Sequence, residues 1–320
     1  MTTTIELTAQ VPVECRGQRF DQIAASLFPD YSRARLQEWI KNGDLTVNEA
    51  VLKPKDKLIG GETLSVNVHL QSEETWQAEA IDIDIVYEDE QIMVVNKPAG
   101  LVVHPAAGNY TGTLVNALLY HLPQMAELPR AGIVHRLDKE TTGLMVVAKT
   151  LAAHHSLVNQ LQARTVSRQY EAVAIGQFTG PGKVNAPIGR HPKQRKQMAV
   201  VLHSGKPAVT HYSVLKRFPR HAHLRLKLET GRTHQIRVHM AHINHPLVGD
   251  PVYGGRFKRP AGIGSQLAET LKQFPRQALH AIELGLEHPA SGEYMQWDVP
   301  LPSDMQNLLS ALEREDEYGS

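Results

Sequence analysis

Short apolar runs rich in β-branched residues, separated by turns, constrain the fold of this chain most strongly. From residue 81 onward such runs recur at 81–87, 92–95, 144–149, 170–176, 208–216 and 222–229. Stretches with helical spacing fall at 112–121, 150–163, 234–243, 266–273 and about 303–315. Strands that follow one another with short turns favour antiparallel or mixed pairing over a doubly wound parallel sheet. The sequence therefore predicts an α+β protein built on a mixed, mostly antiparallel sheet.

The first 75 residues are organised differently. Helices are predicted at 20–27 and 33–41, the second with Ser32 as its N-cap. Short strands are predicted at 45–48, 57–59 and 63–66, after an extended lead-in over 1–15. The polar, aperiodic stretch 69–80 is predicted to be a linker. We therefore expect three parts: a small α+β module at 16–75 with a linker to about 80, a domain at 81–302, and a helix with an acidic tail at 303–320.

Basic side chains are concentrated in one block, although the net charge of the chain is only +1. Residues 186–260 carry fifteen lysines and arginines and nine histidines, but only two acids, Glu229 and Asp250. Clustered cations of this kind bind polyanions because they displace counterions from phosphates. Charge alone leaves a solvated basic face as an equally good interpretation.

Several classes of function lack the motifs that they need. The single cysteine, Cys15, excludes an internal disulfide and any multi-cysteine metal site. No apolar run reaches the roughly 18 residues of a membrane helix, and the N-terminus lacks the basic start of a signal peptide, so a cytoplasmic protein is expected. No complete phosphate-binding loop, dinucleotide fingerprint or G-x-S-x-G element is present. Four histidines between residues 234 and 245 have only Asp250 as a nearby carboxylate, which argues against a metal site.

Four segments carry polar residues that simple strand packing does not explain, namely 96–105, 132–149, 167–172 and 228–240. In the second, a polar cluster around Asp138 lies between two apolar runs, and loops held by flanking strands commonly carry catalytic groups. Asp138 could be a turn residue that binds backbone N–H groups, or a reactive carboxylate paired with an arginine. Arg136, Arg232 and Arg237 are the candidate partners, and spacing alone leaves both interpretations open.

The same segments resemble the motifs of the RluA family of RNA pseudouridine synthases. The H-R-L-D-x-x-T-[ST]-G element is complete from His135 to Gly143, and G-R-T-H-Q-I-R is complete from Gly231 to Arg237. Further matches are K-P-x-G from Lys97 to Gly100, H-P-L-x-G-D-P-x-Y-G from His245 to Gly254, and R-Q-A-L-H-A from Arg276 to Ala281. The resemblance covers about residues 81–302, and residues 16–68 resemble the S4 RNA-binding module.

The resemblance implies that the chain converts uridine to pseudouridine in RNA, a reaction in which the C1′–N1 bond breaks and C5 bonds to C1′. It implies Asp138 as the essential carboxylate, acting at uracil C6, at C1′ or on the 2′ proton, with Arg237 as its ion-pair partner. Tyr170 matches the residue that stacks on the target base, and Arg136 matches the residue that fills the space left by the flipped base. The other expected RNA contacts are Arg232, which could also support its loop, His135 and Lys97, with Arg33 and Arg35 in the S4-like module.

This reaction involves no redox change and no net hydrolysis, so neither a cofactor nor a metal is expected. The resemblance implies 23S rRNA, or a precursor of the large ribosomal subunit, as the partner, with the helix 69 stem-loop as the target. No membrane is expected to be involved, and the chain is expected to act as a monomer. Three alternatives stay open: a synthase for other large-subunit uridines, a non-catalytic RNA-binding protein, and a phosphodiester hydrolase. Asp138 argues against the second, and the scarcity of carboxylates in the basic block argues against the third.

Overall fold

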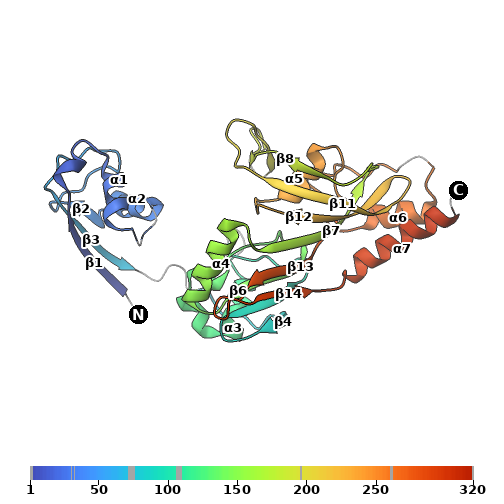
Figure 1. Ribbon diagram of the computed structural model, residues 1–320, viewed down its shortest axis with the longest axis horizontal. Coiled ribbons are helices and arrows are strands. Elements are labelled where there is room, and N and C mark those ends of the chain that lie inside the picture. The colour runs from blue at the N-terminus through green and yellow to red at the C-terminus, as the bar shows by residue number, and fades with distance from the viewer. Residues whose placement is uncertain are drawn as a thin grey trace. The chain divides into compact units, whose positions relative to one another are not determined.

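The chain forms two compact units, Met1–Thr75 and Trp76–Ser320. They are seen in a computed structural model that describes residues 3–29, 31, 33–70, 76–105, 110–194, 197–259 and 262–318 (Figure 1). Ser32, the expected N-cap, lies outside these residues, and so do residues 71–75 of the expected linker. Within the described residues, no helix is both long enough and apolar enough to span a membrane.

The N-terminal unit is a three-stranded antiparallel sheet with two helices. Its elements are β1 (Thr3–Gln10), α1 (Phe20–Leu27), α2 (Arg33–Asn42), β2 (Leu45–Val47) and β3 (Thr63–Leu70). A short 3-10 turn at Val13–Cys15 lies between β1 and α1. The sheet order is β1-β3-β2, and the apolar faces of both helices pack on it in one core that includes Phe20, Ile23, Leu36, Ile40 and Leu64. The helices therefore form because each has one buried stripe, as their periodicity predicted.

Two details of this unit differ from the expectation. The lead-in is a strand that belongs to the module, because β1 pairs with β3 along its whole length from Thr3–Leu70 to Gln10–Thr63. The predicted strand at 57–59 is instead an irregular segment with a single bridge between Lys57 and Arg19. It ends at Gly60, which has a φ of +89° and packs so closely on Val13 that a Cβ would lie 2.8 Å from the Val13 backbone. Such a conformation ends a strand and requires glycine.

The larger unit is built on a mixed sheet of nine strands in the described part of the chain, in the order β4-β5-β6-β13-β7-β12-β11-β8, with β14 beside β13. The strands are β4 (Asp84–Glu88), β5 (Ile92–Lys97), β6 (Thr142–Ala148), β7 (Ser167–Ile175), β8 (Gly182–Asn185), β11 (Val209–Arg217), β12 (His221–Leu228), β13 (Leu279–Glu287) and β14 (Tyr294–Asp298). β9 (Ile188–Arg190) and β10 (Met198–Val200) form a separate antiparallel ribbon. The predicted α+β class and mostly antiparallel sheet are confirmed.

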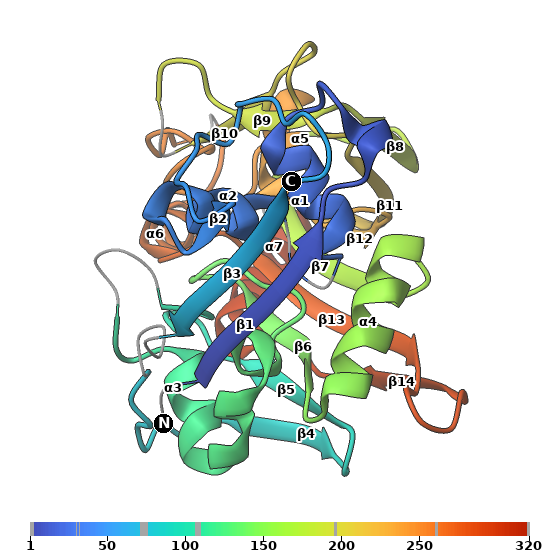
Figure 2. The ribbon, with the colours of Figure 1, turned by 90° about the vertical axis from the view of Figure 1, so that its left-hand side faces the viewer.

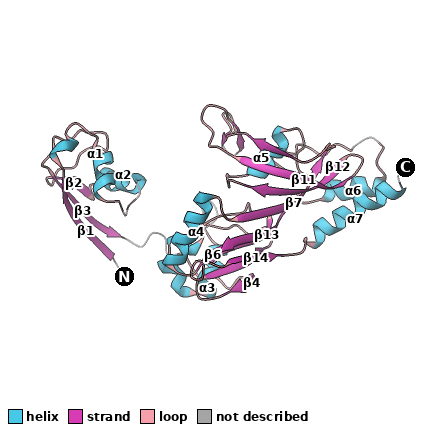
Figure 3. Cartoon of the chain, in the orientation of Figure 1, coloured by secondary structure: helices cyan, strands magenta, loops and turns pink. Residues whose placement is uncertain are grey.

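Both faces of this sheet are covered. The helices are α3 (Leu114–His121), α4 (Leu151–Ala163), α5 (Gln235–His242), α6 (Ser265–Gln273) and α7 (Ser303–Tyr318), with 3-10 turns at Pro123–Glu127 and Pro129–Gly132. Alternate residues of β5 point to opposite cores, so Met93 packs with α3 and α5 on one face while Val94 packs with α4 on the other. Helices α6 and α7 lie together and share a third core with Val173 of β7 (Figure 3). Burial on both faces explains why these strands read as continuous apolar runs.

Strand β13 occupies the middle of the sheet, which the sequence did not predict. It pairs in parallel with β6 and antiparallel with β7, and thereby joins the strands before residue 150 to those between 167 and 228 (Figure 2). The approach to β6 is very close at Gly143, where a Cβ would lie 2.2 Å from the carbonyl oxygen of Ala281. Gly143 also has a φ of +111°, so only glycine fits this junction.

Residues 76–80, expected at the end of the linker, instead belong to the larger unit. Trp76 packs on the core that contains β5 and α3, and its ring lies edge-on to His104 at 4.7 Å. Asn116 donates to the carbonyl of Gln77 at 2.7 Å, and the carboxylate of Glu79 accepts from the Gly112 N–H at 3.0 Å. The polar composition of this stretch concealed these contacts, because most of them are made by backbone and charged groups rather than by an apolar face.

Candidate active site

A cleft of about 810 Å³ opens on the sheet of the larger unit. It is lined by the loop before β6, the start of β7, the end of β12, the loop into α5 and one side of α4. Six arginines line it against two carboxylates, Asp138 and Glu229: Arg130, Arg136, Arg164, Arg168, Arg232 and Arg237. Low-dielectric walls with one sign of charge concentrate the field, so this cleft favours an anionic ligand.

Asp138 lies in this cleft at the end of a loop whose position is fixed on both sides. Leu137 is buried in the core beneath the loop, and the carbonyl of Asp138 accepts from the Thr141 N–H at 3.0 Å, which closes a turn just before β6. Its side chain is 17% exposed, so the carboxylate is mostly shielded but open to the cleft.

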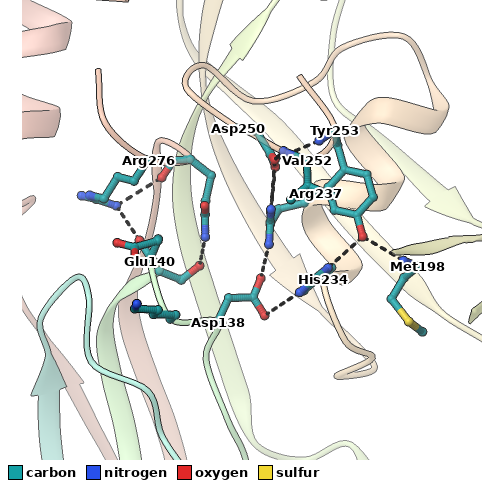
Figure 4. Close-up of polar contacts among 12 residues, drawn as sticks. Asp138, Glu140, Met198, His234, Arg237, Asp250, Val252, Tyr253 and Arg276 are labelled. Carbon is teal, nitrogen blue, oxygen red and sulfur yellow. Dashed lines mark hydrogen bonds and ion pairs between the residues drawn. The ribbon is translucent and has the colours of Figure 1, made fainter. Parts of the chain in front are cut away.

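Arg237 joins Asp138 to a second carboxylate, as Figure 4 shows. Its Nη1 donates to Oδ2 of Asp138 at 2.9 Å, while Nε and Nη2 donate to the two oxygens of Asp250 at 2.7 and 2.9 Å. Burial alone would raise the pKa of Asp250, but Arg237 and the backbone N–H groups of Val252 and Tyr253 outweigh it and lower that pKa. Burial alone would lower the pKa of Arg237, and the two carboxylates raise it. The guanidinium is therefore a fixed cation that holds one oxygen of Asp138 in place.

The other oxygen of Asp138 faces His234. Nε2 of His234 lies 3.7 Å from Oδ1 of Asp138, and its Nδ1 lies 2.8 Å from the hydroxyl of Tyr253. That hydroxyl also accepts from the Met198 N–H at 3.0 Å, so Tyr253 is held in place and fixes the orientation of the His234 ring. Burial lowers the pKa of His234 although the charge of Asp138 raises it, which is consistent with a neutral ring. His234 lies at the N-terminus of α5 with a φ of +56°, a strained conformation for a non-glycine residue.

Lys97 and Arg276, both fully buried, hold the loop that carries Asp138. Nζ of Lys97 donates to the carbonyls of Pro98, Leu101 and Lys139 at 2.8, 3.0 and 2.9 Å. Burial lowers the pKa of Lys97 to about 7, but three acceptors favour the ammonium form, because a neutral amine has only two protons to donate. Arg276 donates to the carbonyl of Glu140 at 3.2 Å and pairs through two nitrogens with Asp304 of α7, at 2.7 and 2.9 Å.

The expected base-stacking residue, Tyr170, lies in the wall of the cleft on β7. It is 6% exposed, packs in the core beneath the cleft, and shares the strand face with Arg168 two residues earlier. Burial raises the pKa of Tyr170, the nearby charge of Arg168 lowers it, and that of Asp138 raises it. Asp138, Arg237 and Tyr170, which are far apart in the sequence, are thus brought to one cleft.

The other expected RNA contacts have varied positions. Arg136 is exposed in the cleft, and no residue described by the structure pairs with it. Arg232 lines the cleft but donates from Nε to the carbonyl of Pro207 at 3.1 Å, so it also supports its loop. Burial lowers the pKa of His135 to about 3, and its Nε2 accepts from the Val146 N–H at 3.0 Å, so this ring is neutral and braces β6.

Lys97 requires a correction. It was expected to contact RNA, but it is 1% exposed and its three protons all go to backbone carbonyls. It therefore has no proton left for a phosphate and acts on the shape of the loop.

In the N-terminal unit, Arg33 donates at 2.8 Å to Asp21, which Arg19 also contacts at 3.0 and 3.1 Å. Both arginines keep nearly half of their side chains exposed, while Asp21 is fully buried. Burial alone would raise the pKa of Asp21, but hydrogen bonds from Arg33, Arg19 and Gln37 outweigh it and lower the pKa to about 2. Arg35 lies on α2, the helix that also carries Arg33, and is half-buried.

Sequence reasoning assigned no role to Asp250, Tyr253 or Arg276 and treated His234 only as a possible metal ligand. All four lie within matched motifs, so the motif boundaries were the available signal. The described residues contain no group of three or more His, Cys, Asp or Glu side chains arranged to hold a metal. His239, for example, is buried and uses both ring nitrogens, on Thr210 and on the carbonyl of Ala186, each at 2.9 Å.

An arginine-held carboxylate and a buried tyrosine thus line one basic cleft on a mixed sheet. A model of the RNA pseudouridylate synthase family matches residues 91–242. Ribosomal large subunit pseudouridine synthase D of Pseudomonas aeruginosa is 61% identical over 317 residues, which cover 99% of each chain. The Escherichia coli K12 protein of that name is 55% identical over 314 residues, covering 98% of this chain and 96% of its own.

Solved structures agree with these relatives. Human RNA pseudouridylate synthase domain containing 4 has a TM-score of 0.57 and 28% identity, covering 72% of this chain and 93% of its own. Human RNA pseudouridylate synthase domain containing 1 has a TM-score of 0.53 and 26% identity, covering 74% and 96%. This chain therefore belongs to the RluA family of RNA pseudouridine synthases, and the predicted enzyme class, an isomerase acting on uridine in RNA, is confirmed.

Proposed function

We propose that this chain converts specific uridines of 23S rRNA to pseudouridine, with the helix 69 stem-loop of the large ribosomal subunit as its target. Support comes from relatives that cover nearly the whole chain and are named for the large ribosomal subunit. The helix 69 assignment rests on the close resemblance of the motifs to that branch of the family. The basic lining of the cleft suits a polyanionic substrate.

The observation that carries this proposal is the chain of contacts from Asp250 through Arg237 to Asp138. It leaves one oxygen of Asp138, Oδ1, turned toward the cleft and His234, while the other is held by Arg237. A carboxylate fixed in this way is ready to act as a nucleophile or base without rearrangement. Addition at C6, attack at C1′ and removal of the 2′ proton are all compatible with this position.

The target uridine has to leave its stack to reach Asp138, because this side chain lies inside the cleft and is only 17% exposed. Arg136 is exposed at the same cleft and is available to occupy the vacated space in the RNA. Isomerisation needs no cofactor, since the electron pair of the broken C1′–N1 bond and the protons are redistributed within the base and sugar.

We further propose that the N-terminal unit binds RNA in the manner of an S4 module. Arg19 and Arg33 present their guanidinium groups from the buried Asp21, which fixes their direction at the start of α1 and α2. Two cations oriented by one buried anion are suited to hold phosphates on a neighbouring RNA helix.

The test is to incubate the purified chain with a helix 69 stem-loop and with intact 23S rRNA, and to map pseudouridine by carbodiimide modification and primer extension. We expect modification in helix 69, and loss of those sites in rRNA from cells that lack the protein. Asp138→Asn should bind the RNA but lose turnover by on the order of 1,000-fold or more, since a catalytic group that touches the substrate is removed. Asp82→Asn, an exposed carboxylate outside the cleft, is the control. Modification at other 23S positions alone would move the target within the subunit, and normal turnover of Asp138→Asn would refute the catalytic assignment.

A further inference from the structure

Arg168 is a buried cation without a partner among the residues that the structure describes. It is 7% exposed, lies in β7 and lines the cleft, yet its side chain makes no hydrogen bond or ion pair among the described residues. Nε is fully buried and unpaired. The guanidinium lies against Gly231, where a Cβ would come within 2.7 Å of Nη1. Gly231, which has no side chain, leaves room for the guanidinium on one side, and Tyr170 lies on the same strand face. No carboxylate among the described residues pairs with the guanidinium.

Among the described residues, the other two buried arginines of this unit are each paired with a carboxylate. Arg237 and Arg276 each direct two nitrogens onto a carboxylate, Asp250 and Asp304 respectively. Burial of an ion costs several kcal/mol unless it is paired and hydrogen-bonded. Proteins retain such an unfavourable burial mainly at functional sites, so we expect an atom of the bound substrate to accept hydrogen bonds from Arg168.

We propose that Arg168 is a further catalytic residue, which donates hydrogen bonds to a carbonyl oxygen of the target uracil and stabilises the negative charge on that ring during the reaction. This inference rests on the proposed function. When the C1′–N1 bond breaks before the sugar has recombined with C5, its electron pair leaves with the base and spreads onto O2 and O4. When a nucleophile adds at C6 instead, the charge appears on O4. In each route the C1′–N1 bond breaks and C5 bonds to C1′, a carboxylate that had added at C6 or C1′ leaves again, N1 gains a proton and C5 loses one, while Arg168 keeps its own protons throughout.

The role follows from position as well as charge. Every available route places negative charge on a uracil oxygen at some stage, so the need for a resident cation does not depend on which atom Asp138 attacks. Arg168 shares its strand face with Tyr170, the residue that matches the base-stacking tyrosine, and is therefore placed at the depth of the base. The RNA backbone remains nearer the exposed arginines, such as Arg136. A phosphate oxygen would offer similar chemistry, and the experiment separates the two sources.

The test compares Arg168→Met and Arg168→Lys with wild type in the full chain, using the helix 69 stem-loop or whichever RNA the wild type modifies. Single-turnover rates, RNA dissociation constants at several salt concentrations and melting temperatures are measured. We expect Arg168→Met to slow the single-turnover rate by about 100-fold, the usual effect of removing one donor to a developing anion, and Arg168→Lys to recover part of it. RNA affinity and its salt dependence should stay within about twofold of wild type. The melting temperature should be equal or higher, because an unpaired buried charge is removed.

Arg314→Met, an exposed arginine near the C-terminal end of α7, is the matched control and should leave all three measurements unchanged. A normal rate for Arg168→Met overturns the inference. Weaker binding with a salt slope reduced by about 1 identifies a phosphate contact instead. Loss of rate together with a lower melting temperature, without recovery in Arg168→Lys, makes Arg168 structural. If the wild type itself forms no pseudouridine in any RNA, the proposed function fails first.

Discussion

At the scale of single residues, the site depends on side chains that fix the direction of others. Asp250 holds Arg237, Arg237 holds one oxygen of Asp138, and Tyr253 orients His234 toward the other oxygen. Tyr253 also lies under the Arg237 guanidinium, with its ring centre 5.0 Å away. The ring and the hydroxyl of one residue thus support two different neighbours of Asp138.

Tyr253→Phe separates these two tasks. The ring remains under Arg237, but His234 loses the hydroxyl that orients its ring, so we expect kcat to fall by about tenfold with little change in KM. Steady-state rates of tritium release from RNA containing 5-tritiated uridine measure this. Tyr294→Phe, on the exposed strand β14, is the matched control. A change confined to KM would assign Tyr253 to RNA binding.

The residues of the site were predictable only where a motif named them. Asp138 and Arg237 are 99 positions apart, and spacing alone could not choose between Arg136, Arg232 and Arg237 as the partner. The resemblance selected Arg237, and the ion pair at 2.9 Å agrees with it. Burial distinguishes residues that the motifs alone do not. Lys97 and Arg136 are both cations in matched motifs, but the fold buries Lys97 and leaves Arg136 exposed in the cleft.

At the scale of elements, two clamps hold the loop before β6 against its neighbours. Lys97 at the end of β5 binds the carbonyl of Lys139, and Arg276 just before β13 binds that of Glu140. Both act on backbone atoms immediately after Asp138. The position of that carboxylate is therefore set by strands on either side of β6 and not by its own loop alone.

Lys97→Met tests the first clamp. It leaves buried carbonyls without a donor, so the unfolding free energy should fall by about 1–3 kcal/mol, and kcat should fall because the loop loses its brace. RNA affinity should not change, which separates this role from the phosphate contact that the sequence suggested. Lys272→Met, on exposed α6, serves as the control. The measurements are urea unfolding, kcat and the RNA dissociation constant, and weakened RNA binding with normal stability would contradict the correction.

The buried Asp21 gives the N-terminal unit a specific acid sensitivity. Its pKa is about 2 in the folded unit against roughly 3.9 in an unfolded chain, so its stabilising effect is complete above about pH 4 and is lost as the pH falls toward 2. Asp21→Asn should therefore lower the unfolding free energy of this unit by on the order of 2 kcal/mol at pH 7 and flatten its pH dependence between 4 and 2.

Fluorine NMR of protein labelled with 5-fluorotryptophan can follow this unit within the full chain. Trp39 in α2 reports on it, while Trp76 and Trp297 lie in the larger unit. Glu14→Gln, an exposed carboxylate of the same unit, is the control. An unchanged urea midpoint at the Trp39 signal in Asp21→Asn would show that Asp21 adds nothing to stability.

Helices and edge-to-edge hairpins were easier to predict than the centre of the sheet. The periodicity of 150–163 gave α4 to within a residue, and the runs at 208–216 and 222–229 gave the hairpin of β11 and β12. β13 was not predicted because two of its pairing partners, β6 and β7, are more than a hundred residues away in sequence and its own run mixes His, Glu and Gly with leucines. The local pattern of apolar residues indicates which side chains are buried, but it does not indicate which distant strand is the pairing partner.

At the scale of the whole molecule, the two units have separate cores. Buried members of the first core end at Val68, and none of the described residues before Trp76 belongs to the cores of the larger unit. Each unit is therefore expected to hold its own fold.

Removal of residues 1–75 should accordingly leave a folded, active enzyme, provided that Trp76 is kept. We expect the truncated chain to modify a short stem-loop with a raised KM, to lose part of its site choice on intact 23S rRNA, and to show a slightly flatter salt dependence of binding. Melting curves and pseudouridine maps measure these effects, and a chain that starts at residue 81 should be less stable because Trp76, Gln77 and Glu79 are lost. Unchanged KM and site choice would mean that the first unit serves another partner.

The central position of β13 has a consequence for how the protein is made. Without it, the sheet falls into two pieces, β4-β5-β6 with Asp138 and β7-β12-β11-β8 with Arg237 beyond its end. During translation both pieces leave the ribosome before residue 287 does, each with an open strand edge and neither with both Asp138 and Arg237. We therefore expect the nascent chain to stay inactive beside the class of RNA that it is proposed to modify, until β13 has been synthesised and inserted between β6 and β7.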